Sequence, residues 1–165
     1  MATIHQRITN CLWFDSEAEE AAKHYTSIFP NSSLGLISHF GKEGFEFHKK
    51  PEGSIMTVMF NLDGQEFMGL NGGPDFKFNE AMSLVINCAN QQEIDHYWSK
   101  LSEGGEEGYC GWLKDKFGVS WQVVAEGWAE MMSDPDKAKV SRVMVEVFKM
   151  RKPDLAVIQR AFNGK

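Results

Sequence analysis

The sequence has few cysteines and no long apolar run, and both absences restrict what the chain can be. Its three cysteines, Cys11, Cys88 and Cys110, are widely spaced and form no CxxC pair, which indicates neither a disulfide framework nor a zinc motif. No stretch of 18 apolar residues is present, so no membrane-spanning helix is predicted. The apolar run before Asp15 is too short for a signal peptide. These features predict a cytoplasmic protein with reduced thiols.

Positive charge is also scarce. Lys and Arg number 17 against 23 Asp and Glu, which gives a net charge of −6, and the basic residues are dispersed. A nucleic-acid-binding surface needs a basic stripe, and so does an anionic membrane surface, so neither partner is expected. The 165 residues fit one domain, which buries roughly 70% of its unfolded surface and needs no metal or disulfide for stability.

The first part of the chain predicts a strand followed by a helix. Residues 4–14 are rich in β-formers, and Ser16 with Glu19 three positions later has the form of a capping box. Pro30 ends the helix, and Asn31-Ser32-Ser33 is expected to form the next turn. The apolar face of this helix is Ala18, Ala21, Ala22, Tyr25, Ile28 and Phe29.

Three further strands follow in the first half. A short strand is predicted over 34–40, and the polar, Gly-rich segment 41–53 is expected to be a mobile loop. The runs 54–62 and 65–71 flank Asp63-Gly64, a pair typical of a type I′ hairpin turn because both positions need φ above zero.

The second half repeats the same order. A strand is predicted over 82–88, and Asn90 with Glu93 predicts a second helix start. The runs 109–114 and 120–125 predict two more strands. The apolar face of the second helix, which is the first face shifted by 76 residues at four positions, is Ile94, Tyr97, Trp98 and Leu101.

Past Glu126 the pattern changes to helices. Asp134-Pro135-Asp136 predicts a helix start, and Pro153-Asp154 opens a last helix through Phe162. This tail either packs on its own domain or forms a subunit interface. Its apolar face is Val140, Val143, Met144 and Val147.

The order β-α-β-β-β, met twice, resembles the vicinal oxygen chelate superfamily, which includes glyoxalase I, extradiol dioxygenases and bleomycin-resistance proteins. The strings LNGGP…FNEA and CGWLKDKFG…WQ are similar to the PhnB-like family, some members of which carry the name 3-demethylubiquinone 3-methyltransferase. The similarity extends over nearly the whole chain, tail included. It implies an α+β fold in which two βαβββ modules, 1–75 and 76–125, form a curved mixed-sheet cleft, with a helical tail over 126–165.

The superfamily's metalloenzymes hold a metal with four ligands, two from each module. Transferred to this chain, those places are Ile8, Met68, Ser83 and Gln122. None is a residue that hard or borderline divalent metals prefer. Glu66 is nearby but is assigned to the face opposite Met68. No metal and no cofactor are therefore expected.

The remaining polar and aromatic side chains of the cleft predict a site for a small organic ligand. Gln122 and Ser83 either contact that ligand or hydrogen-bond each other. The predicted ligand-binding residues are Met68, Asn71, Ser83, Trp112 and Gln122.

Three functions follow, in order of preference. The first is metal-free binding of a small molecule by a homodimer, with the ligand unidentified. The second is a glyoxalase- or dioxygenase-like enzyme, which the superfamily supports and the four transferred positions oppose. The third is methyl transfer, which has only the family name behind it, because neither Gly72-Gly73 nor Gly104-Gly105 lies between a strand and a helix.

Overall fold

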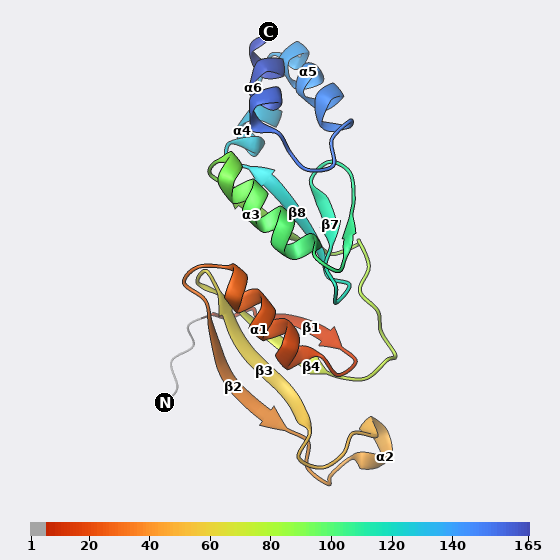
Figure 1. The fold of residues 1–165 in the computed structure, drawn as a ribbon. Coiled ribbons are helices and arrows are strands. Elements are labelled where there is room, and N and C mark those ends of the chain that lie inside the picture. Colours follow the sequence, from red (N-terminus) through yellow and green to blue (C-terminus); the bar gives the residue numbers. More distant parts are fainter. Residues whose placement is uncertain (1–5) are drawn as a thin grey trace. The chain divides into compact units, whose positions relative to one another are not determined.

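The chain divides into two compact units, Met1–Lys77 and Phe78–Lys165, in a computed structural model that describes residues 6–165 (Figure 1). Each unit contains one open four-stranded sheet, with orders β1-β4-β3-β2 and β5-β8-β7-β6. In each unit, the strand that comes first in the chain runs parallel to the strand that comes last, β1 with β4 and β5 with β8. The other neighbouring strands are antiparallel. The predicted α+β fold with a duplicated module and C-terminal helices is therefore confirmed. Residues 4 and 5 of the first predicted strand lie outside the described part.

The first unit follows the predicted order closely. Asp63 and Gly64 have φ values of 46° and 86°, as a type I′ turn between β3 and β4 requires. The segment 41–53, predicted as a loop, contains one helical turn, α2, whose Phe45 and Phe47 side chains are exposed. The elements are β1 (Asn10–Phe14), α1 (Ala18–Ile28), β2 (Ser33–His39), α2 (Phe45–His48), β3 (Ile55–Leu62) and β4 (Gln65–Asn71).

The start of α1 differs from the predicted capping box. Ser16 does not cap the helix, which begins at Ala18 with no side-chain cap from its N-cap residue Glu17. Instead, Asn71 at the end of β4 accepts a hydrogen bond from the Ala18 backbone N–H at 2.9 Å. The same side chain donates to the Ile55 carbonyl at 3.0 Å, so one buried amide joins α1, β3 and β4.

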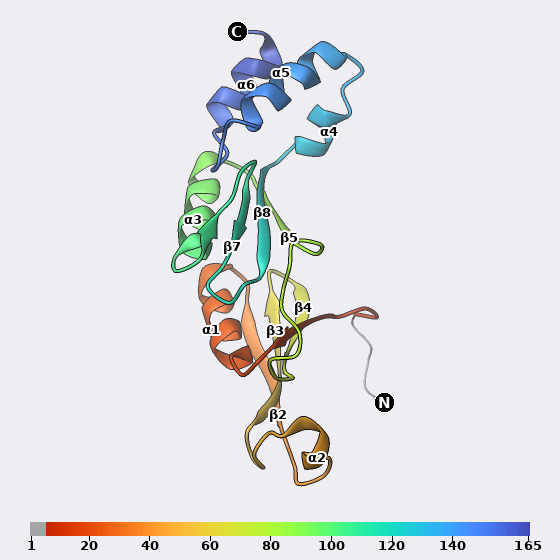
Figure 2. The same ribbon diagram turned by 90° about the vertical axis from the view of Figure 1, so that its right-hand side faces the viewer.

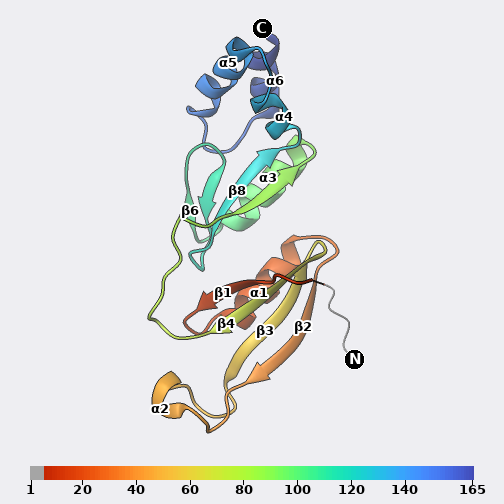
Figure 3. The same ribbon diagram turned by 180° about the vertical axis from the view of Figure 1, so that it is seen from behind.

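The core of the first unit lies between α1 and one face of its sheet. The predicted helix face is confirmed, except that Phe29 is only partly buried at the C-cap. Gly69 permits a close approach, because a Cβ there would lie 3.1 Å from the Ala18 Cβ. Phe60 stacks on Phe67 with ring centroids 5.4 Å apart. Among residues 6–77, no helix covers the face of the sheet away from α1, as Figure 3 shows from behind.

The second unit repeats the arrangement with a local cap. Asn90 accepts from the Glu93 backbone N–H at 3.0 Å, and the Glu93 carboxylate accepts from the Ala89 N–H at 2.9 Å, which confirms the predicted capping pair. A two-residue strand, β6, was not predicted. The elements are β5 (Leu84–Cys88), α3 (Gln91–Ser102), β6 (Glu106–Glu107), β7 (Trp112–Lys114), β8 (Ser120–Ala125), α4 (Trp128–Met132), α5 (Lys137–Val147) and α6 (Leu155–Asn163).

The turn before β8 is held by a buried carboxylate. Asp115, 3% exposed, accepts hydrogen bonds from the backbone N–H groups of Phe117 and Val119 and from the Trp121 indole N–H at 2.8 Å. The last bond fixes a core side chain of β8 directly. In β8, which follows this turn, Gln122 is paired with Val85 of β5 and with Trp112 of β7.

The C-terminal helices lie beyond the ends of β7 and β8 in Figures 1 and 2. Val143 and Val147 of α5 pack against Ile158 and Ala161 of α6, so the predicted apolar face is used within the unit. The tail is tied to the sheet by the Cys110 and Gly111 N–H groups, which donate to the carbonyls of Met150 and Arg151. Within residues 6–165, no helix has both the length and the apolar character needed to cross a membrane.

Replacing Asn71 should test its bridging role. Asn71→Ala removes the cap of α1 and a buried bond to β3, so we expect a loss of about 2–4 kcal/mol in the free energy of unfolding. Asn90→Ala, which removes an exposed cap, is the matched control and should cost about 1 kcal/mol. Urea unfolding followed by circular dichroism measures both. Equal losses in the two variants would contradict the bridging role.

Candidate functional site

The two faces of the second sheet differ in character. Trp121 and Val123 of β8 are buried on the face that α3 covers, whereas Gln122 and Val124 point to the other face and are half-buried. Trp112 of β7 is the register partner of Gln122 and shares its face. The polar and aromatic side chains proposed for ligand contact in this unit therefore lie on the face without α3.

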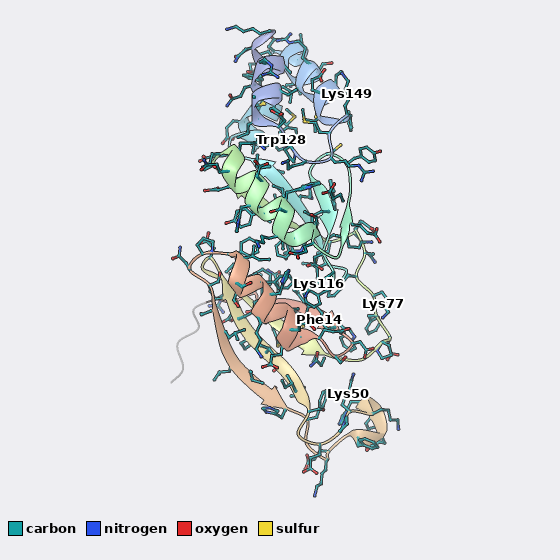
Figure 4. The ribbon with its side chains drawn as sticks, viewed as in Figure 1. Phe14, Lys50, Lys77, Lys116, Trp128 and Lys149 are labelled. Atoms are coloured by element: carbon teal, nitrogen blue, oxygen red, sulfur yellow. The ribbon has the colours of Figure 1, made fainter. Side chains whose placement is uncertain are left out.

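An apolar cavity of about 150 Å³ opens where this sheet meets the C-terminal helices. Trp112 and Gln122 line it from the sheet. Trp128, at the start of α4 and labelled in Figure 4, lines it from the tail. Phe148, at the C-terminal end of α5, is 65% exposed and marks a side open to solvent. The other lining residues are Cys110, Gly111, Val123, Val124, Met144, Val147, Met150, Pro153 and Ile158.

Gln122 is the main hydrogen-bonding side chain of this cavity. Its Nε2 donates to Ser83 Oγ at 2.8 Å, so Ser83 orients the amide. No residue in the described range 6–165 donates to Gln122 Oε1. The hydrogen bond between the two side chains, one of the two alternatives, is therefore present, and contact of Gln122 with a ligand stays a prediction.

The remaining predicted site residues belong to the first unit, on β4. Met68 points to the face away from α1, and Asn71 points toward α1, where both halves of its amide are hydrogen-bonded. Asn71 is therefore engaged in the fold. Of the five residues, the structure brings together Ser83, Trp112 and Gln122.

Strand register corrects one of the four transferred metal positions. Gln122 is paired with Val85, and Ser83 precedes Val85 by two residues. In the first unit Met68 is paired with Cys11, so the equivalent of Ser83 is Thr9. Ile8, which was assigned to this position from the sequence, immediately precedes Thr9, and its side chain is 82% exposed.

The assignment of Glu66 was also wrong. Glu66 and Met68 are two residues apart in β4 and share one face, and Glu66 Oε1 accepts from the Thr9 hydroxyl at 3.2 Å. Even so, within residues 6–165 no three His, Cys, Asp or Glu side chains are grouped so that they could hold a metal ion. After this correction, the four transferred positions, called the inherited positions below, are Thr9, Met68, Ser83 and Gln122. They supply two hydroxyls, a thioether and an amide, which do not fit a divalent metal.

The walls contributed by the tail were missed by the sequence reasoning. Met144 was predicted only as part of an apolar packing face, and Trp128 and Phe148 were not identified, although an aromatic residue three positions after a core strand was an available signal. Their place at the cavity depends on how the tail folds back onto the sheet. Helical periodicity alone does not give that information.

A duplicated βαβββ module with an open sheet in each half defines the vicinal oxygen chelate class of fold. The model of the family described as 3-demethylubiquinone-9 3-methyltransferase matches residues 6–124, and the chain belongs to that family. The matched region ends before α4. The tail, which the resemblance was expected to include, and its part of the cavity therefore lie outside the matched residues.

Solved structures agree with this assignment. The PhnB protein of Bacillus cereus is 37% identical over 73% of this chain and 99% of its own, with a TM-score of 0.64. A Pseudomonas aeruginosa protein is 21% identical over 73% of this chain and 98% of its own, with a TM-score of 0.59. FosX of Listeria monocytogenes, solved with Mn(II), is 13% identical over 79% and 98%, with a TM-score of 0.53, and shows a shared fold alone. No curated protein matches the sequence significantly.

The inherited positions predict that divalent metals do not bind there. Ni²⁺, Zn²⁺, Fe²⁺ or Mn²⁺ added to the untagged protein should leave the melting temperature unchanged. A metal at 100 times its dissociation constant would instead add about 2.7 kcal/mol of stability. Thermal melts with and without each metal measure this. Stoichiometric metal retained by wild-type protein but lost in Gln122→Leu would contradict the prediction.

Proposed function

We propose that the second unit binds a small, largely apolar organic molecule through the cavity beside Gln122. The observation that carries this proposal is that Gln122, whose Oε1 accepts no hydrogen bond from residues 6–165, lines a largely apolar space with aromatic walls. Small-molecule sites typically combine apolar walls with a few placed polar groups that fix orientation. We include Ser83 and Trp112 in the site, Ser83 as the residue that holds the amide.

Size and chemistry restrict the ligand class. An apolar cavity of about 150 Å³ accommodates a molecule of roughly the size of benzene. Trp112 and Trp128 offer flat surfaces that favour an aromatic or planar group. Because the available amide atom is an acceptor, the ligand should carry a hydrogen-bond donor such as a hydroxyl or an amine.

Two enzymatic alternatives have weaker support. Lyase or dioxygenase chemistry of the superfamily uses a metal as a Lewis acid, and the donor set at the inherited positions does not fit one. Methyl transfer, which the family description names, commonly uses a glycine-rich turn between a strand and a helix for the methyl donor. Gly72-Gly73 instead leads from β4 toward β5, and Gly104-Gly105 follows α3. We therefore prefer binding.

We further propose that the protein acts in the cytoplasm as a homodimer. The free thiols of Cys11, Cys88 and Cys110 agree with a reducing compartment. Apolar side chains that a second copy would cover are available in each unit. Leu36 is 82% exposed in the first unit, and Phe148 is 65% exposed in the second.

The ligand site can be tested with phenol and toluene, which differ chiefly in the hydroxyl donor. Wild-type protein should bind phenol about five- to tenfold more tightly than toluene, because one hydrogen bond contributes about 1 kcal/mol. Gln122→Leu keeps the volume but removes the acceptor, so the preference should disappear. Saturation-transfer NMR titrations measure both affinities.

Ser83→Ala is the matched control for that experiment. It removes the partner of Gln122 Nε2 but leaves Oε1 in place, so a preference for phenol should persist. If wild-type protein bound both compounds equally, or if Gln122→Leu kept the preference, the proposed role of Gln122 would be wrong. A thermal melt of Gln122→Leu checks that the variant is folded.

The dimer is tested by sedimentation velocity at micromolar concentration. We expect a single species of twice the chain mass, and Leu36→Glu should shift it toward monomer, because a charge cannot be buried unpaired. Ser33→Glu, at another exposed position in the same strand, serves as a control for added charge. A monomer of wild-type protein at tens of micromolar would refute the dimer.

A further inference from the structure

Three sulfur-containing side chains stand in one row across the first sheet. Cys11 of β1 is the register partner of Met68 of β4, and Met68 is the register partner of Met59 of β3. These strands are neighbours in the order β1-β4-β3. The row of Cys11, Met68 and Met59 therefore runs straight across three adjacent strands.

All three side chains point to the face away from α1. Leu12, Val58 and Phe67, the neighbours of the row in the three strands, are buried on the α1 side. Since successive side chains of a strand alternate between faces, the row lies on the opposite side. Cys11 is exposed, and Met59 and Met68 are half-buried, so the sulfur atoms are not enclosed within the core of this unit.

The spacing of the row suits a shared ligand. Neighbouring strands lie about 4.8 Å apart, and methionine has three rotatable side-chain bonds, so the thioethers can swing toward the central position. On β2, beyond Met59, the next position is Gly35, where a Cβ would lie 3.2 Å from the Met59 Cβ. Because Gly35 has no side chain, nothing from that position occupies the space beside Met59.

We propose that Cys11, Met59 and Met68 bind one Cu(I) ion. A thiolate with two thioethers is a soft donor set, and such sets select Cu(I) over hard or borderline divalent metals. On binding, the Cys11 thiol releases its proton to solvent and forms the Cu–S bond, with no change in oxidation state. The thiolate and the monovalent cation sum to zero charge, which suits a row of uncharged side chains.

This site is distinct from the cavity of the proposed function. It lies entirely in the first unit, and the cavity lies entirely in the second unit. It also differs from the divalent-metal site of the superfamily, with which it shares only the position of Met68. Failure of either proposal leaves the other standing.

The test is competition with the chromogenic Cu(I) chelator bicinchoninate under anaerobic conditions, using the full chain. Wild-type protein should withdraw one equivalent of Cu(I). Cys11→Ser should abolish that withdrawal, and Met59→Leu and Met68→Leu, which conserve volume, should each weaken it by about tenfold or more. X-ray absorption should show that only sulfur atoms are bonded to the copper.

Two variants on the same protein act as controls. Cys110→Ser removes a thiol of the second unit. Met56→Leu removes a thioether of β3 whose side chain, like that of Val58 two residues later, points to the face covered by α1. Both variants should bind Cu(I) as tightly as wild-type protein. Cys88 is fully buried, so it should not compete with the exposed Cys11. No withdrawal by wild-type protein, withdrawal unaffected by Met59→Leu and Met68→Leu, or an equal loss in Cys110→Ser would overturn the proposal.

Discussion

The parallel pairing of the first and last strands in each unit is the constraint on which the rest of the structure depends. A parallel pair cannot be closed by a hairpin, so the chain must cross over, and in both units α1 or α3 forms part of that connection. This crossover helix then covers one face of its sheet, and the opposite face is not covered by it. Gln122, Met68 and their neighbours owe their position on the uncovered face to this pairing.

The two units use the uncovered face differently, because the tail follows the second sheet. α4, α5 and α6 lie beyond the ends of β7 and β8 (Figure 1). The segments that join them are held by backbone bonds from Cys110 and Gly111 and by the Gln91 side chain, which bonds to Pro153 and Leu155. The result is an apolar cavity with one oriented amide. Since the family model ends before α4, the tail would give this chain a pocket that the common part of the family does not itself specify.

Local signals in the sequence predicted most elements, and non-local contacts account for the errors. The Asp63-Gly64 turn and the Asn90–Glu93 pair depend on neighbouring residues and were correct. The cap of α1 comes from Asn71, which is 53 residues away, so no local pattern reveals it. Thr9 was missed by a single residue because only the pairing of β1 with β4 fixes the register. The cavity needed the path of the tail, which periodicity does not give.

The central claim is that the second unit holds an organic molecule beside Gln122 and not a divalent metal. Native mass spectrometry of the protein purified without added ligand tests it most directly. The account predicts a mass above that of the polypeptide by an organic compound, which is released on unfolding and is retained by a smaller fraction of Gln122→Leu. A divalent metal bound in stoichiometric amount, or the organic adduct at equal occupancy on Gln122→Leu, would contradict it.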